Sequence, residues 1–165
     1  MVSIFVAAPA SATELVLEPS YRVHQSDTLG DDKRLDIDLR LTSTLGFLPP
    51  QLQFEVRAGW RSFSYLGDLD GVPLTIGPRF YILDGMLRPS IYAAGGAFFG
   101  YLEQFDNAGS VISPLISFGA AFDVVVSEWV GGVYVGWEKY FHQLGISGFD
   151  PADWVMAGLR FGRQF

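Results

Sequence analysis

The sequence predicts an all-β fold: an eight-stranded antiparallel up-and-down β-barrel that crosses a membrane and has a polar interior filled by side chains. Eight stretches alternate apolar and polar residues with a period of two, and the connections between them alternate between long and short. The last stretch ends on an aromatic residue, Phe165. Successive side chains of a strand point to opposite faces, so each stretch offers one face to hydrocarbon and the other to a polar lumen.

Each predicted strand is long enough for the roughly 9 to 11 tilted residues that one crossing of a bilayer requires. No helix is expected between the strands. The strands are expected near residues 13–24, 34–44, 51–64, 72–82, 88–102, 113–126, 128–141 and 153–165.

Charged and apolar side chains separate by parity in the first four strands. In the first strand the odd positions from Leu15 to Val23 are apolar or aromatic, and in the second the odd positions of 35–41 are Leu, Ile, Leu and Leu. In the third and fourth strands the apolar parity is even, at 52–60 and 74–80. All charged residues of these four strands fall on the opposite parity, which is therefore the predicted inner face.

The last four strands continue the pattern with fewer charges. The outward parity is odd at 91–101 in the fifth strand and even at 116–126 in the sixth, and the other faces are rich in Gly, Ala and Ser. The outward sets of the seventh and eighth strands are Trp129, Val133, Val135, Trp137 and Phe141, and Val155, Ala157, Leu159, Phe161 and Phe165.

The connections fall into two classes, and their order predicts an orientation. Tight connections are expected at 45–50, at 83–87 and near Ser127. An even strand count places both termini on the side of these tight turns, which in transmembrane barrels faces the periplasm, so the long loops are expected outside. The longer connections, polar and rich in turn residues, are expected at 25–33, 65–71, 103–112 and 142–152.

One domain is expected over residues 13–165, because no change in composition or linker divides the chain. Residues 1–12 are interpreted as a signal-peptide remnant or an N-terminal tail. Their apolar core closes on Ala10-Ser11-Ala12, which is typical of a secretory cleavage site, but no positively charged segment precedes it.

Composition excludes several classes of function. Hydrophobic residues make up 49% of the chain, yet no run of about 18 apolar residues would form a membrane-spanning helix. The net charge of −7 argues against nucleic acid as a partner, since its backbone needs a basic surface. The absence of cysteine rules out disulfides and thiolate metal sites.

A soluble barrel of lipocalin type is the alternative fold, with the apolar face turned inward. The separation of charges by parity does not decide which of the two faces points out of the barrel. Aromatic residues near the strand ends favour the membrane, because such residues form girdles at both interfaces of transmembrane barrels. The residues expected in these girdles are Trp60, Tyr65, Tyr101, Trp129, Trp137, Phe141 and Phe165.

Over residues 13–165 the chain resembles the eight-stranded outer-membrane β-barrels of the OmpA/OmpX type. The most specific part is the last strand, where Leu159, Phe161 and the terminal Phe165 are similar to the signal that the barrel-assembly machinery recognises. Arg163 interrupts this set, close enough to the end to reach the headgroups. The resemblance implies a porin-like protein of a Gram-negative outer membrane, with outer-membrane lipid, lipopolysaccharide and the assembly machinery as partners.

The charges of the inner parity are expected to pair across the lumen, because an eight-stranded barrel is only just wide enough for side chains to fill it. The predicted interior holds eight acidic residues and six arginines: the eleven residues of the network listed next, and Glu14, Asp36 and Glu128 on the same parity. The predicted interior network comprises Glu18, Arg22, Asp38, Arg40, Glu55, Arg57, Arg61, Arg79, Asp123, Glu138 and Arg160.

The leading functional hypothesis is a non-enzymatic barrel with a structural, anchoring or partner-binding role in the envelope, without a cofactor or a metal. Acidic residues crowd the predicted loops, where they could bind a protein partner or bridge to lipopolysaccharide through divalent cations. The only lysine or arginine of the predicted loops is Lys33. The acidic residues are Asp27, Asp31, Asp32, Asp68, Asp70, Glu103, Asp106, Asp150 and Asp153.

Two alternatives remain open at this point. A narrow channel would run through the polar lumen. A lipid-modifying enzyme would use a site at the outer rim, where His24 and His142 share the inner parity near Ser147, Asp150 and Asp153. These residues match no defined catalytic motif, and the two histidines lack the fixed spacing of a metal site.

Overall fold

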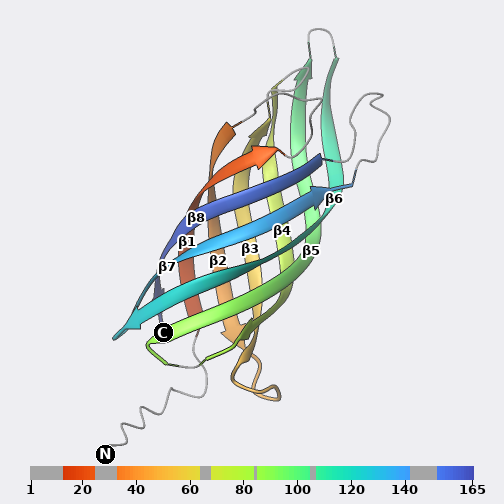
Figure 1. Cartoon of the computed structure of the whole chain (residues 1–165). Helices are drawn as coiled ribbons and strands as arrows, with labels where there is room; N and C mark the ends of the chain where they lie inside the picture. Colours follow the sequence, from red (N-terminus) through yellow and green to blue (C-terminus); the bar gives the residue numbers. More distant parts are fainter. Residues whose placement is uncertain (1–12, 25–32, 64–67, 84, 105–106, 142–151) are drawn as a thin grey trace, which may run out of the picture.

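The structure is a computed structural model and describes residues 13–24, 33–63, 68–83, 85–104, 107–141 and 152–165. These residues form a closed barrel in which each strand is antiparallel to its neighbours in sequence, and β1 pairs with β8 (Figure 1). The predicted all-β, eight-stranded antiparallel fold is therefore confirmed. The strands are β1 (Thr13–His24), β2 (Lys33–Thr44), β3 (Leu52–Phe63), β4 (Asp68–Tyr81), β5 (Leu87–Gln104), β6 (Asn107–Val126), β7 (Trp129–Tyr140) and β8 (Ala152–Gln164).

The barrel closes where the first and last strands meet. Leu17 is the register partner of Phe161, and the backbones of Thr13 and Phe165 exchange two N–H···O bonds of 3.3 and 2.8 Å. The start of β1 and the end of β8 thus share one end of the barrel with the tight turns (Figure 1). We call this the terminus end, and the opposite end, where β1 ends and β2 begins, the loop end.

The tight turn predicted near Ser127 joins β6 to β7. Ser127 has a φ of 56°, in the left-handed region that a two-residue hairpin connection requires. Val126 and Trp129 are register partners on its two sides. The short turn places β6 and β7 side by side and leaves Glu128 on the surface, half-exposed.

Two of the predicted long loops are largely strand, which corrects the boundaries at 65–71 and 103–112. β4 begins at Asp68, whose register partner is Glu103, and β5 and β6 remain paired up to Gln104 and Asn107. Polar and turn-forming residues made 103–112 resemble a loop, but hairpin hydrogen bonds need no particular side chains. The β5–β6 hairpin consequently extends beyond the other strands at the loop end (Figure 1).

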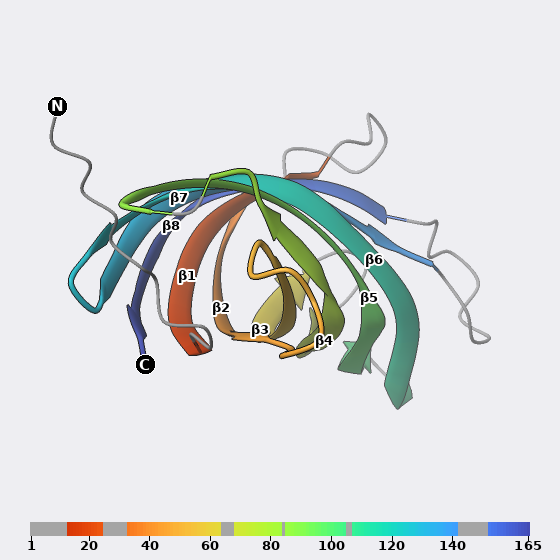
Figure 2. The same cartoon turned by 90° about the horizontal axis from the view of Figure 1, so that it is seen from below.

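The two faces of the barrel differ sharply in exposure. The large hydrophobic side chains of the predicted outward parity are exposed, for example Ile37 at 52% and Val135 at 57%, whereas their sequence neighbours Asp38 and Gly136 are buried. Figure 2 shows the strands from the terminus end, and the pairing of β1 with β8 closes them into a barrel. Within the described ranges, no helix is long and apolar enough to cross a membrane.

Candidate functional site

The candidate site is the lumen, where the described residues bury fourteen charged side chains. Seven of these are acidic and seven are arginines. The lumen contains every residue of the predicted interior network together with Glu14, Asp36 and Arg88. The expected ratio of eight acids to six arginines is wrong for two reasons. Glu128 lies on the β6–β7 turn with its side chain 48% exposed, and Arg88, near the start of β5, points inward.

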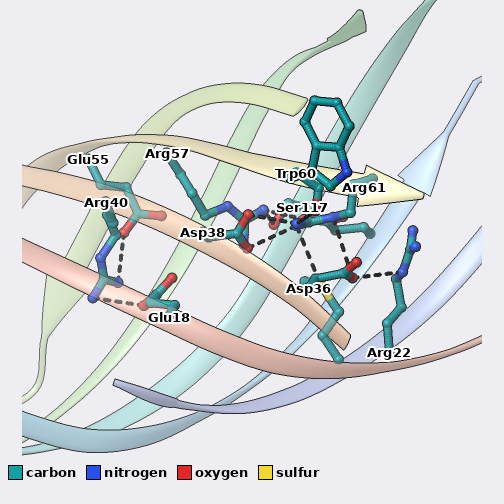
Figure 3. A network of polar contacts seen from close by, with 12 residues as sticks. Glu18, Arg22, Asp36, Asp38, Arg40, Glu55, Arg57, Trp60, Arg61 and Ser117 are labelled. Atoms are coloured by element: carbon teal, nitrogen blue, oxygen red, sulfur yellow. Dashed lines mark hydrogen bonds and ion pairs between the residues drawn. The ribbon is translucent and has the colours of Figure 1, made fainter. Parts of the chain in front are cut away.

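Six lumen residues form a network centred on Arg61, nearer the loop end. Arg61 donates to both carboxylate oxygens of Asp38, at 2.7 and 2.9 Å, and its Nη2 lies 3.3 Å from Glu138 Oε1. Arg57 also donates to Glu138. Arg22 Nε lies 2.8 Å from Asp36 Oδ2 (Figure 3). We call these six residues the Arg61 network; they are Arg22, Asp36, Asp38, Arg57, Arg61 and Glu138.

A second network lies nearer the terminus end and is centred on Arg40. Its guanidinium bridges Glu18, at 3.0 Å, and Glu55, at 3.3 Å, two carboxylates on different strands (Figure 3). Arg79 Nε lies 2.6 Å from Glu55, and Arg160 Nε lies 2.9 Å from Glu18. Arg160 also pairs with Asp123. The Arg40 network therefore comprises Glu18, Arg40, Glu55, Arg79, Asp123 and Arg160.

The remaining two lumen charges form a pair of their own. Arg88 Nη2 lies 2.5 Å from Glu14 Oε1, and the Tyr81 hydroxyl is 3.2 Å from Glu14 Oε2. Each network thus contains three arginines and three acids, and the pair contains one of each. Charge is balanced within each group, so no described lumen charge is left without an opposite partner, which would cost several kcal/mol.

Glycines of the inner parity make room for these large side chains. A Cβ on Gly59 would lie 1.7 Å from Asp38 Oδ1, and one on Gly132 would lie 2.4 Å from Asp123 Oδ1. A Cβ on Gly136 would lie 2.4 Å from the hydroxyl of Tyr92. Large and small inward residues therefore alternate, which is how a narrow barrel is filled.

A buried cluster of mostly aromatic side chains, which we call the plug, lies inside the barrel at the loop end, and sequence reasoning missed it. The Phe63 ring makes edge contacts with Phe98, Tyr140 and Trp154 at centroid distances of 5.4 to 5.6 Å. The Arg22 guanidinium lies 4.4 Å from the Phe63 ring and 4.3 Å from the Trp154 ring. The plug comprises Phe63, Leu69, Phe98, Leu115, Tyr140 and Trp154. The available signal was the presence of bulky aromatic residues on the otherwise polar parity.

Among the described residues, the outer face of β7 and β8 carries no charged side chain between two levels of ion pairs. Lys139 and Asp153, 3.4 Å apart, mark the level near the loop end, and Arg163 and Glu128, 2.7 Å apart, mark the level at the terminus end. The register pairs Lys139 with Asp153 and Trp129 with Arg163, so nine residues of β7 and nine of β8 lie between these levels. That length matches one tilted crossing of a bilayer by a strand, roughly 9 to 11 residues.

The other predicted residues are distributed as follows. Leu159, Phe161 and Phe165 are exposed on the outer face, as are Trp60, Tyr101 and Trp129. His24 is the last residue of β1. No cluster of metal-ligating side chains occurs in the part of the chain that the structure describes. Tyr65, His142, Ser147 and the loop acids Asp27, Asp31, Asp32, Asp106 and Asp150 lie outside the described residues.

Sequence comparison finds no matching family model and no matching curated protein. Structural comparison does find similar folds. Neisserial surface protein A has a TM-score of 0.70 at 8% identity, over 95% of this chain and 98% of that chain. The N-terminal β-barrel domain of Pseudomonas aeruginosa OprF has a TM-score of 0.58 at 15% identity, over 92% and 97% of the two chains.

A third structure is Ail, the attachment invasion locus protein of Yersinia pestis. Its TM-score is 0.56 at 15% identity, over 93% of this chain and 98% of that chain. The structural neighbours are bacterial outer-membrane proteins. The resemblance seen in the sequence is therefore confirmed at the level of the fold: this chain has the fold of the eight-stranded outer-membrane β-barrels.

Proposed function

We propose that this chain is a non-enzymatic integral protein of a Gram-negative outer membrane, where the barrel serves as an anchor. The observation that carries this proposal is the uncharged belt between the Lys139–Asp153 and Arg163–Glu128 pairs. Exposed Leu, Ile, Val and Phe cover the belt, and in water such a surface would cost about 25 cal/mol for each Å². Contact with the hydrocarbon of a membrane removes this cost, so the apolar belt is suited to a bilayer.

The direction of the two faces favours the membrane over a soluble barrel. A lipocalin-type barrel in water would turn its apolar parity inward and its charges outward. Here Leu39 is 50% exposed while its neighbours Asp38 and Arg40 are fully buried. The same inversion recurs on other strands, for example at Arg160 and Phe161.

The packing of the lumen supports a barrel that does not conduct ions. The Arg61 network joins non-adjacent strands, as the contact from Arg57 on β3 to Glu138 on β7 shows. In the Arg40 network, Arg160 on β8 contacts Asp123 on β6. At the loop end the plug adds a layer of aromatic rings. An ion would have to displace both layers, so the narrow-channel alternative has less support than the anchor.

The orientation and the partners are part of this proposal. The terminus end would face the periplasm, because short turns face that side in bacterial barrels, and the loop end would face outside. Loop acids would then meet lipopolysaccharide, through divalent cations, or a protein partner in the envelope. The barrel-assembly machinery would insert the chain.

Refolding tests the membrane assignment. In detergent or lipid the chain should give a compact form that migrates differently on gels with and without heating. In planar bilayers this form should stay silent over a wide voltage range. A folded, monodisperse protein in plain buffer would refute the membrane assignment, and steady conductance would refute the closed lumen.

A further inference from the structure

The outer face has an apolar groove close to the terminus end. Its volume is about 910 Å³, and residues of β1, β2, β6, β7 and β8 line it. The apolar walls include Leu17, Val124, Val133 and Phe161. The groove therefore lies within the belt that we assign to lipid, next to the level marked by Arg163.

A missing side chain creates the groove. Gly131 belongs to the outward parity of β7, between Trp129 and Val133, and no atom lies within 4 Å of where its Cβ would be. Its register partners are Val124 on β6 and Phe161 on β8, and Phe161 in turn pairs with Leu17. The backbone of Gly131 thus forms the floor of a hollow between apolar side chains.

The end of the groove carries two opposite charges. Arg163 Nη2 lies 2.7 Å from Glu128 Oε2, and the two side chains are 47% and 48% exposed. The Arg163 guanidinium also lies 5.9 Å from the Trp129 ring and 5.4 Å from the Phe165 ring. A guanidinium has five N–H donors, so the contact with Glu128 leaves others free for a second acceptor.

We propose that this groove binds one zwitterionic glycerophospholipid whose headgroup carries a primary ammonium. An acyl chain lies over Gly131, the lipid phosphate accepts hydrogen bonds from Arg163, and the ammonium donates to Glu128. Arg163 and Glu128 match this headgroup because they place a cation and an anion side by side. An anionic lipid would be repelled by the Glu128 carboxylate. The inference rests on the proposed membrane location and goes beyond it, since it distinguishes one lipid from the surrounding bilayer.

Native mass spectrometry of the full chain in detergent tests this inference. Phosphatidylethanolamine, phosphatidylcholine and phosphatidylglycerol with identical acyl chains are added in turn, and the lipids retained by each barrel are counted. We expect one phosphatidylethanolamine to be retained in preference to the other two. Glu128→Gln should remove the preference over phosphatidylcholine, and Arg163→Gln should weaken retention roughly tenfold, the scale of one lost charge-assisted hydrogen bond.

The second part of the experiment fills the groove with a side chain. Gly131→Leu should abolish retention, whereas Gly95→Leu should leave it unchanged. Gly95 is a matched control because it also faces outward with open space at its Cβ position, but it lies on β5, away from the groove. Gel mobility with and without heating is recorded for every sample, so loss of the barrel is distinguished from loss of lipid.

Three results would overturn the inference. Equal retention of the three lipids would show contact without selectivity. Unchanged retention in folded Gly131→Leu would place the lipid elsewhere. A dimer in place of a lipid adduct would assign the groove to a second copy of the chain. Failure of the wild-type chain to fold in detergent would instead contradict the membrane proposal itself.

Discussion

Arg61 binds both carboxylate oxygens of Asp38 inside the barrel, with Nη1–Oδ1 and Nη2–Oδ2 distances of 2.7 and 2.9 Å. Both side chains are fully buried. The pair occupies the space in front of Gly59, where a Cβ would lie 1.7 Å from Asp38 Oδ1 and 2.9 Å from Arg61 Nη1. This bidentate geometry therefore depends on the absence of a side chain at Gly59.

Gly59→Ala should destabilise the barrel by about 1 to 3 kcal/mol, the usual range for overpacking. The added methyl group must displace the Asp38 carboxylate from Arg61. Denaturant unfolding in detergent measures the change, with Gly95→Ala as the control, because the Cβ of that variant meets open space. Equal stability of the two variants would contradict the role of Gly59.

The ion pair of Glu14 and Arg88 allows a double-mutant cycle. Arg88→Met alone should cost about 3 to 5 kcal/mol, because Glu14 would remain buried without its cation. Adding Glu14→Gln to Arg88→Met should recover part of that loss, since the unpaired charge is removed. If the double variant loses as much as the two single variants together, the two residues do not interact.

Val135→Arg should cost about 2 to 4 kcal/mol, as arginine does on a lipid face at the membrane midplane. Val135 lies midway between the two charged levels of β7 and is 57% exposed. Val126→Arg is the matched variant, because Val126 is similarly exposed but lies beside the β6–β7 turn, where the cost should be about 0 to 1 kcal/mol. Unfolding in lipid vesicles compares the two. Equal costs would argue against a belt in hydrocarbon.

Phe165→Ala should reduce the amount of barrel inserted in cells far more than it reduces stability in detergent. The backbone bonds between Thr13 and Phe165 are kept, and the ring is already 65% exposed, so its burial contributes less than the roughly 1.5 to 3 kcal/mol of a fully buried side chain. Phe122→Ala removes an exposed ring far from the terminus and serves as the control. Unchanged insertion would argue against an assembly signal at Phe165.

The sequence could predict which side chains of each strand face into the barrel and which face out of it. Alternation places each side chain inside or outside regardless of register, so the faces of strands such as β2 and β3 follow directly. Arg88 was left out of the predicted interior, although it lies within the predicted strand 88–102 on the parity opposite to the outward set, and it is buried. Strand pairing at Gln104 and Asn107 depends on backbone hydrogen bonds, which turn-forming residues also make.

The partners in the lumen could not be predicted, because they depend on the stagger of the whole barrel. Arg57 and Glu138 are 81 residues apart and lie on β3 and β7, which are not neighbours. Whether they meet depends on the register of every strand between them. The plug has the same origin: Phe63 and Trp154 share the inner parity with charged residues, and only the closed barrel brings them together.

Because the buried charges of the lumen balance one another, they can be considered separately from the remaining charges of the chain. Of the chain's 11 basic and 18 acidic residues, seven of each cancel within the described lumen, so the remaining four basic and eleven acidic residues account for the whole net charge of −7. The long-range field of the protein is therefore set by charges other than the fourteen buried in the lumen. Substitutions in the loops could reverse that field, and with it the repulsion between neighbouring barrels, without disturbing a single buried ion pair.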